Sequence, residues 1–298
     1  MSFLLLTVVA IFGFALTGCG SNNASGGSSS GGGKSVGDQV NNTITGIDPG
    51  AGIMQSADKA LKDYGLDQWQ VQSSSESTMM AQLKKAYAKK QPIVITGWSP
   101  HWMFAQYDLK YLKDPKHSFG QEEEIRTVAH KGFSSEHPNA AKFFKQFQWT
   151  EDDMNDVMLN IEKGKEPADA AKEWVDQNQD LVKKWTDGVE KVSGKKLSIA
   201  YVAWSSEVAS TAVVKNVLES YGYKVTLQQV DAAPMWAAVA KGSADVTLSA
   251  WLPVTHEAYY KKYKDQVEVL HTNLKGTKLG LVVPKYMKDV NSIEDLKK

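Results

Sequence analysis

The chain has 298 residues and carries 34 lysines and arginines against 34 aspartates and glutamates, so its formal net charge is zero. This balance argues against a nucleic-acid-binding protein, which would show a basic excess. The single cysteine leaves no pair for a disulfide framework and no cysteine-rich metal site, while the length is sufficient for two lobes of ordinary domain size.

The N-terminal segment has the pattern of a lipoprotein signal. Residues 3–18, FLLLTVVAIFGFALTG, are short for a transmembrane helix and typical of a signal-peptide core. The following LTGC resembles a bacterial lipobox, which makes Cys19 the expected lipidated residue. No lysine or arginine precedes the apolar core, so a truncated start, or retention of the segment itself as the anchor, stays open. We expect a signal segment over residues 1–19 and a flexible Ser/Gly linker over 20–39.

The first strand–helix unit contains a candidate anion site. Residues 43–47 are expected to form a strand and residues 54–64 a helix, with the glycine-rich turn DPGAGI between them. Free amides at such a helix start bind anions, so the amides of Gly52 and Ile53 could meet a carboxylate. The Lys-Ser/Thr pair of a phosphate loop is missing. A plain tight turn is the alternative.

The remaining elements predict an α/β protein. We expect short strands near residues 71–75, 93–98, 125–133, 197–204, 224–230, 246–251 and 279–287. Helices are expected over 77–89, 207–221 and 234–241, and in a run before residue 195 whose aromatic residues are typical of a core. Alternating strands and helices indicate a parallel sheet. The acidic run at residues 122–124 is expected to be a solvated helix start.

Three of these strands end in a tryptophan: IVITGW at Trp98, LSIAYVAW at Trp204 and VTLSAW at Trp251. Ligands of open α/β sheets bind at the carboxyl ends of strands, and tryptophan ring faces attract a quaternary ammonium ion. Ordinary packing is the alternative for each ring. His256 follows Trp251 by five residues. His101 has no second ligand at metal spacing, so we expect it to be structural.

Several longer motifs carry a family resemblance. They are ITGIDPGAGIM, ITGWSPHWMF, LKYLKDPK, IAYVAW, LSAWLPVTH, LGLVVPKYM and NSIEDLKK. With them the chain, over residues 40–298, resembles the substrate-binding protein of an OpuA-type glycine betaine importer, an ATP-binding-cassette (ABC) system. The resemblance implies a two-lobed, periplasmic-binding-protein-like (Venus-flytrap, type II) α/β fold with a ligand cleft between the lobes. It also implies a cation cage of Trp98, Trp204 and Trp251. The amides matching Gly52 and Ile53, together with His256, would bind the ligand carboxylate.

The order of the motifs suggests how the lobes are connected. We expect LGLVVPKYM to cross between the lobes and residues 125–133 to form the return crossing. Lobe one would then comprise residues 40–120 plus 281–298, and lobe two residues 121–280. Two crossings make a hinge, so closure around the ligand is the expected motion.

The implied function is extracytoplasmic capture of glycine betaine or proline betaine and delivery to the permease subunits of an ABC importer, for osmoprotection. No enzyme activity, cofactor or metal is expected. Carnitine, choline and dimethylsulfonium osmolytes are the alternative ligands. A secreted hydrolase is disfavoured because no nucleophile elbow and no HExxH motif is present. An adhesive lipoprotein would show no saturable binding. Either a neutral imidazole donating one N–H or a charged imidazolium could meet the carboxylate. Since the charged form binds more strongly, the sequence predicts that binding through His256 tightens as the pH falls.

Overall fold

The computed structural model describes residues 34–297, so the predicted lipidation site at Cys19 lies outside the described residues. The helices are α1 (Val36–Val40), α2 (Gly52–Tyr64), α3 (Glu76–Ala88), α4 (Met103–Gln106), α5 (Phe133–Glu136), α6 (Pro138–Gln146), α7 (Glu151–Glu162), α8 (Pro167–Gln177), α9 (Gln179–Trp185), α10 (Ser205–Ser220), α11 (Ala232–Ala240), α12 (Glu257–Tyr263) and the 3₁₀ helix η1 (Ile293–Lys297). The strands are β1 (Thr43–Thr45), β2 (Gln70–Gln72), β3 (Ile95–Ser99), β4 (Leu109–Tyr111), β5 (Glu123–His130), β6 (Lys196–Tyr201), β7 (Lys224–Gln229), β8 (Val246–Leu252) and β9 (Val267–Pro284). In these residues no helix is long and apolar enough to cross a bilayer.

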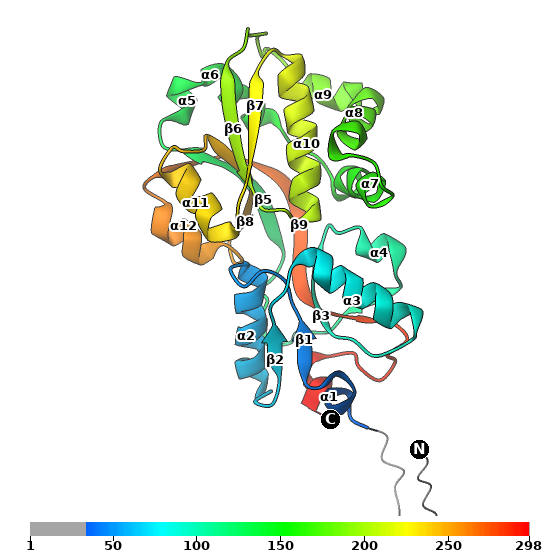
Figure 1. Cartoon of the computed structure of the whole chain (residues 1–298). Helices are drawn as coiled ribbons and strands as arrows, with labels where there is room; N and C mark the ends of the chain where they lie inside the picture. The colour runs from blue at the N-terminus through cyan, green and yellow to red at the C-terminus, as the bar shows by residue number, and fades with distance from the viewer. Residues whose placement is uncertain (1–33, 298) are drawn as a thin grey trace, which may run out of the picture. The chain divides into compact units, whose positions relative to one another are not determined.

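The strands form a mixed sheet in the order β2-β1-β3-β9-β5-β8-β6-β7, with β4 also paired to β9. The long strand β9 belongs to both lobes. Its residues 267–277 pair with β5, and its residues 278–284 pair with β3 and β4. Figure 1 shows this strand, orange to red, running from one set of strands to the other. The two-lobed α/β fold is therefore as the sequence predicts.

Both connections between the lobes come earlier in the chain than the sequence predicts. Residues 279–284 of LGLVVPKYM form the lobe-one end of β9, so the chain has crossed just before this motif, near residues 277 and 278. The other crossing comes earlier than predicted. Strand β4 pairs with the lobe-one end of β9 and β5 with its lobe-two end, which places this crossing in residues 112–122. Tertiary pairing decides this point, and the strand pattern of 125–133 alone does not show it. The exact lobe boundaries stay a prediction.

Local sequence explains where the elements nearest the site begin and end. Strands β3 and β8 stop directly before Pro100 and Pro253, which lack the amide that a further ladder hydrogen bond needs. Helix α2 begins at Gly52, two residues earlier than the apolar pattern predicts. Its N-cap residue Ala51 makes no side-chain hydrogen bond. The first amides of α2 are therefore left without a capping side chain.

The aromatic residues of the helical region belong to the core, as predicted. Trp174 stacks on Trp185 with ring centroids 5.7 Å apart, and Trp149 meets the edge of Trp174 at the same distance. All three rings are buried. They serve as controls for the tryptophans discussed below.

Candidate functional site

One cavity is lined by Trp98, Trp204 and Trp251, which we call the cage tryptophans. Trp98 lies in β3 and Trp251 in β8, while Trp204 is the N-cap residue of α10, three residues beyond the end of β6. The cavity has about 290 Å³ of empty volume, its mouth included. Ile47, Ala51, Gly52, Ile53, Thr255 and Leu279 complete its lining. The structure therefore brings the three strand-end tryptophans together, with rings from both lobes.

Each cage ring has a different support. The edge of Trp98 meets His101 at a centroid distance of 4.7 Å and an interplanar angle of 80°. The indole N–H of Trp204 donates to Asp48 Oδ2 of lobe one at 2.9 Å. The indole N–H of Trp251 has no hydrogen-bond partner among the described residues. Sequence reasoning treated Asp48 only as part of a turn, because its partner lies 156 residues further along the chain.

Gly52 and Ile53 line the same cavity from the first turn of α2. Their uncapped amides and the positive end of the helix dipole make this wall suitable for a carboxylate. Gly52 also lies directly against lobe two. A Cβ atom placed on it would come within 2.0 Å of the backbone oxygen of Thr255. Only glycine permits this approach, which closes one side of the cavity.

The acidic run predicted as a solvated helix start is instead the beginning of β5, so that prediction is wrong for Glu123. Glu123 is 1% exposed and accepts hydrogen bonds from the backbone amides of Val254 and Thr255 and from the Thr255 hydroxyl. These three donors satisfy the buried carboxylate. Glu123 thereby holds the turn that places Thr255 against Gly52 and leads into His256. No local sequence pattern predicts this role, since the two residues that donate to Glu123 lie 131 and 132 residues further along the chain.

His256 is fully buried beside the cage and is not among the residues that line the cavity. Its ring centroid lies 6.5 Å from that of Trp204. The Nδ1 atom accepts the backbone N–H of Trp251 at 3.2 Å. The ring proton of the neutral imidazole therefore sits on Nε2, which has no partner in the part of the chain that the structure describes.

This geometry favours the opposite pH dependence from the one that the sequence predicts. Burial lowers the pKa of His256 to about 4, and the smaller opposing effect of the Ser249 backbone does not offset it. A protonated ring would also direct its Nδ1–H at the N–H of Trp251. The buried ring is therefore neutral in this structure, with its proton on Nε2.

We expect ligand affinity to be constant above about pH 7 and to weaken as the pH falls below about 6.5, the ordinary histidine pKa. The reason is that a histidine protonated in the open protein must lose its proton when the lobes close. Closure therefore becomes less favourable as the pH falls below the pKa of His256 in the open protein. Calorimetric titrations from pH 5 to 8 measure this. His256→Ala should bind the ligand more weakly and lose the dependence of affinity on pH. The control variant His271→Ala should retain that dependence. Tighter binding at low pH would contradict a neutral His256 as the donor.

A buried carboxyl group lies behind the cage. Glu207, in the first turn of α10, is 2% exposed, and its Oε2 accepts the backbone N–H of Val202 at 3.0 Å. Burial raises the pKa of Glu207 to about 8, although the Ser249 hydroxyl and the Trp251 indole N–H face the carboxyl group and act in the opposite direction. Neither donor reaches hydrogen-bond geometry with Oε1. Sequence reasoning missed Glu207, whose burial depends on the packing of α10 against β8.

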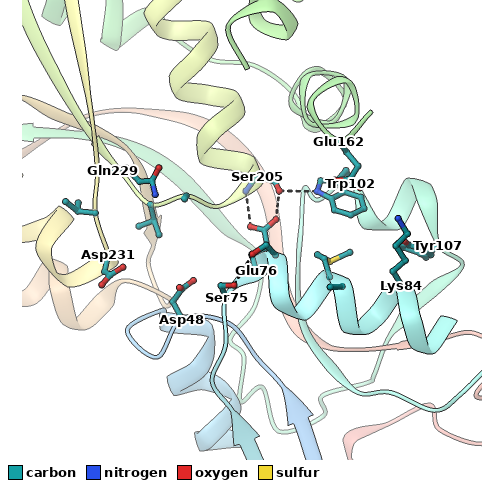
Figure 2. A pocket seen from close by; sticks show the side chains of 16 residues that line it. Asp48, Ser75, Glu76, Lys84, Trp102, Tyr107, Glu162, Ser205, Gln229 and Asp231 are labelled. Atoms are coloured by element: carbon teal, nitrogen blue, oxygen red, sulfur yellow. Dashed lines mark hydrogen bonds between the residues drawn. The ribbon is translucent and has the colours of Figure 1, made fainter. Parts of the chain in front are cut away.

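A second, larger cavity adjoins the cage and has about 1330 Å³ of empty volume (Figure 2). Asp48, Glu76, Glu162 and Asp231 give it an acidic lining, with Lys84 and Trp102 among its other residues. Trp102 lines this cavity and not the cage. No three His, Cys, Asp or Glu side chains within residues 34–297 are placed to hold a metal ion.

Known proteins are similar in sequence to this chain over nearly its whole length. The family described as the substrate-binding domain of the ABC-type glycine betaine transport system, OpuAC, matches residues 27–177 and 195–298. The glycine betaine/carnitine transport binding protein GbuC of Listeria monocytogenes is 50% identical over 292 residues, covering 97% of this chain and 96% of that protein.

Two solved structures resemble the chain over about half its length. Lactococcal OpuAC, in a closed conformation with glycine betaine, is 48% identical, with a TM-score of 0.49 over 50% of this chain and 59% of that one. The glycine/betaine/L-proline-binding protein ProX of Borrelia burgdorferi is 34% identical, with a TM-score of 0.48 over 50% and 57%. This chain thus spans less than two thirds of either solved structure. The family match and the identity to GbuC together show that the chain belongs to the substrate-binding domains of ABC-type glycine betaine transport systems.

Proposed function

We propose that this protein captures glycine betaine between its two lobes and delivers it to the permease of an ABC importer. One observation carries the proposal: three tryptophans from both lobes line the same cavity as the uncapped amides of Gly52 and Ile53. The rings would serve a cation, and the amides at the start of α2 would serve a carboxylate. These are the two charged groups of a betaine.

The chemistry of the ligand explains this division. A quaternary ammonium ion has no N–H to donate, so ring faces replace its water at about 0.5–2 kcal/mol per ring. The carboxylate needs donors, which the amides of Gly52 and Ile53 and the Nε2–H of His256 would supply. Because the cage rings are buried, these interactions operate in a site with little competing water.

The family is one of transport proteins and not of enzymes, and a binding protein of an importer works outside the cytoplasm. We propose further that Cys19 carries the lipid that anchors the protein to the cell membrane, with residues 20–39 as the tether. The lobes are proposed to comprise residues 40–120 with 281–298, and 121–280.

Replacing Cys19 by alanine should release the protein from the membrane fraction and leave ligand affinity unchanged, because the site lies entirely within residues 47–279. Immunoblots of fractionated cells, with calorimetry on the purified variant, measure both. If the variant stays in the membrane fraction, the apolar segment itself is the anchor.

The choice among ligands is tested by calorimetric titration with glycine betaine, proline betaine, carnitine and choline. Glycine betaine and proline betaine should bind most tightly, because a short ligand can reach the cage and the amides together. Choline has the cation without the carboxylate and should bind more weakly. The absence of saturable binding by all four ligands would overturn the proposal. A preference for choline would show that the proposed carboxylate donors do not contribute to binding.

A further inference from the structure

A buried carboxylate forms hydrogen bonds between the two lobes beside the cage. Glu76, the first residue of α3 in lobe one, is 5% exposed. Its Oε2 accepts the backbone N–H of Ser205 in lobe two at 2.9 Å, and its Oε1 accepts the Ser205 hydroxyl. Figure 2 shows both contacts between the ends of the two helices. Ser205 begins α10 and directly follows the cage residue Trp204.

The surroundings of Glu76 hold its carboxylate ready for Ser205. His101 Nδ1 accepts the backbone N–H of Met103 at 3.0 Å, so the proton of the neutral ring is on Nε2, which lies 3.1 Å from Glu76 Oε1. Trp102 donates its indole N–H to the Ser205 hydroxyl at 3.0 Å. His101 thus has the structural role that the sequence predicts.

The helix that receives this carboxylate favours a negative charge. Helix α10 has 16 residues, and its N-cap residue, Trp204, supplies no capping side chain. Glu76 takes that place from the other lobe, against the positive end of the helix dipole. Charge-assisted hydrogen bonds of this kind are shorter and stronger than neutral ones. The cap therefore exists only while the lobes are together.

We propose that Glu76 and Ser205 form a latch that holds the closed state and fixes Trp204 in the cage, so that Glu76 is a positioning residue that sets how long the ligand remains bound. The proposal rests on the proposed function, in which the ligand is enclosed by lobe closure. On opening, both groups return to water. Their contact therefore stabilises the closed state alone and slows dissociation, while the encounter of ligand with the open protein is unaffected.

The matched variants are Glu76→Gln and Glu162→Gln. Glu162, the last residue of α7, lines the same acidic cavity as Glu76. Stopped-flow tryptophan fluorescence gives the association and dissociation rates for glycine betaine. Glu76→Gln should raise the dissociation rate about tenfold, the loss expected for a charge-assisted hydrogen bond, and change the association rate by less than about twofold. Glu162→Gln should match the wild type. Equal dissociation rates for the two variants would overturn the latch.

A double-mutant cycle separates the latch from general damage to the fold. Ser205→Ala removes the hydroxyl from the lobe-two side and keeps the backbone N–H. Because both changes break the same contact, the combined variant should dissociate more slowly than the product of the single effects predicts. Strictly multiplicative effects would show that Glu76 acts independently of Ser205.

Measurement without ligand distinguishes failure of the latch from failure of the proposed function. Spin labels at Lys62→Cys in lobe one and Lys184→Cys in lobe two, both exposed positions, report the distance between the lobes. A Cys19→Ser background removes the only native cysteine. The closed population of the ligand-free protein should fall in Glu76→Gln and not in Glu162→Gln. Unchanged populations would refute the latch, whereas a wild type that closes normally without binding glycine betaine would refute the ligand assignment alone.

Discussion

Replacing any one of the cage tryptophans by alanine should weaken glycine betaine binding by about 1–3 kcal/mol, roughly ten- to a hundredfold in Kd. Each change removes one ring face from the cation and opens the cavity to water. Phenylalanine or tyrosine at the same positions should retain part of the affinity, because a smaller ring still offers a π face. Isothermal titration calorimetry at constant pH and salt measures the effect.

The other buried tryptophans provide the control. Trp174 packs against Trp149 and Trp185 and does not line the cavity, so Trp174→Phe should leave the affinity unchanged. Melting temperatures of all variants without ligand identify any that fail to fold. Wild-type affinity in all three alanine variants would show that the cation is not held by the cage.

Gly52→Ala should prevent the lobes from closing. The added Cβ would lie 2.0 Å from the backbone oxygen of Thr255, which cannot give way as a flexible side chain would. Overpacking of this kind costs about 1–3 kcal/mol or more, so affinity should fall about a hundredfold. Alanine is the better helix former, so the open, ligand-free protein should be as stable as the wild type or more so. Calorimetry and thermal denaturation measure the two effects separately.

Gly50→Ala is the matched control. Gly50 lies in the same turn, but the nearest atom to its added Cβ would be the Tyr259 hydroxyl at 3.8 Å, an ordinary contact. This variant should bind normally. Small-angle scattering with and without glycine betaine should show ligand-dependent compaction for Gly50→Ala and none for Gly52→Ala. Normal compaction of Gly52→Ala would mean that the lobes close without the approach of Gly52 to Thr255.

The features that the sequence predicts correctly are encoded by neighbouring residues. Strands β3 and β8 end at the residues before Pro100 and Pro253, each two residues after a cage tryptophan, so local backbone chemistry places Trp98 and Trp251 near strand ends. The glycine-rich turn before α2 likewise places Gly52 and Ile53 at a helix start. That three rings share one cavity follows from the meeting of the two lobes. The strand pattern indicated this arrangement with ordinary packing as the alternative, and the family resemblance favoured it.

The features that sequence reasoning missed depend on contacts between distant residues. Glu123 lies in an acidic run that locally resembles a solvated helix start, and only the turn after β8 supplies the donors that allow its burial. Glu76 has the sequence context of an ordinary first-turn glutamate, and its partner is 129 residues away. The burial that lowers the pKa of His256 likewise follows from tertiary packing and has no local sequence signal.

A crystal structure of the protein with glycine betaine tests the central claim most directly. The account predicts the quaternary nitrogen within about 6 Å of the centroids of all three cage rings, the distance at which cation–π attraction is effective. It also predicts the carboxylate at hydrogen-bond distance from the amides of Gly52 and Ile53 and from Nε2 of His256. Glycine betaine bound instead in the larger acidic cavity, with the cage empty, would contradict it.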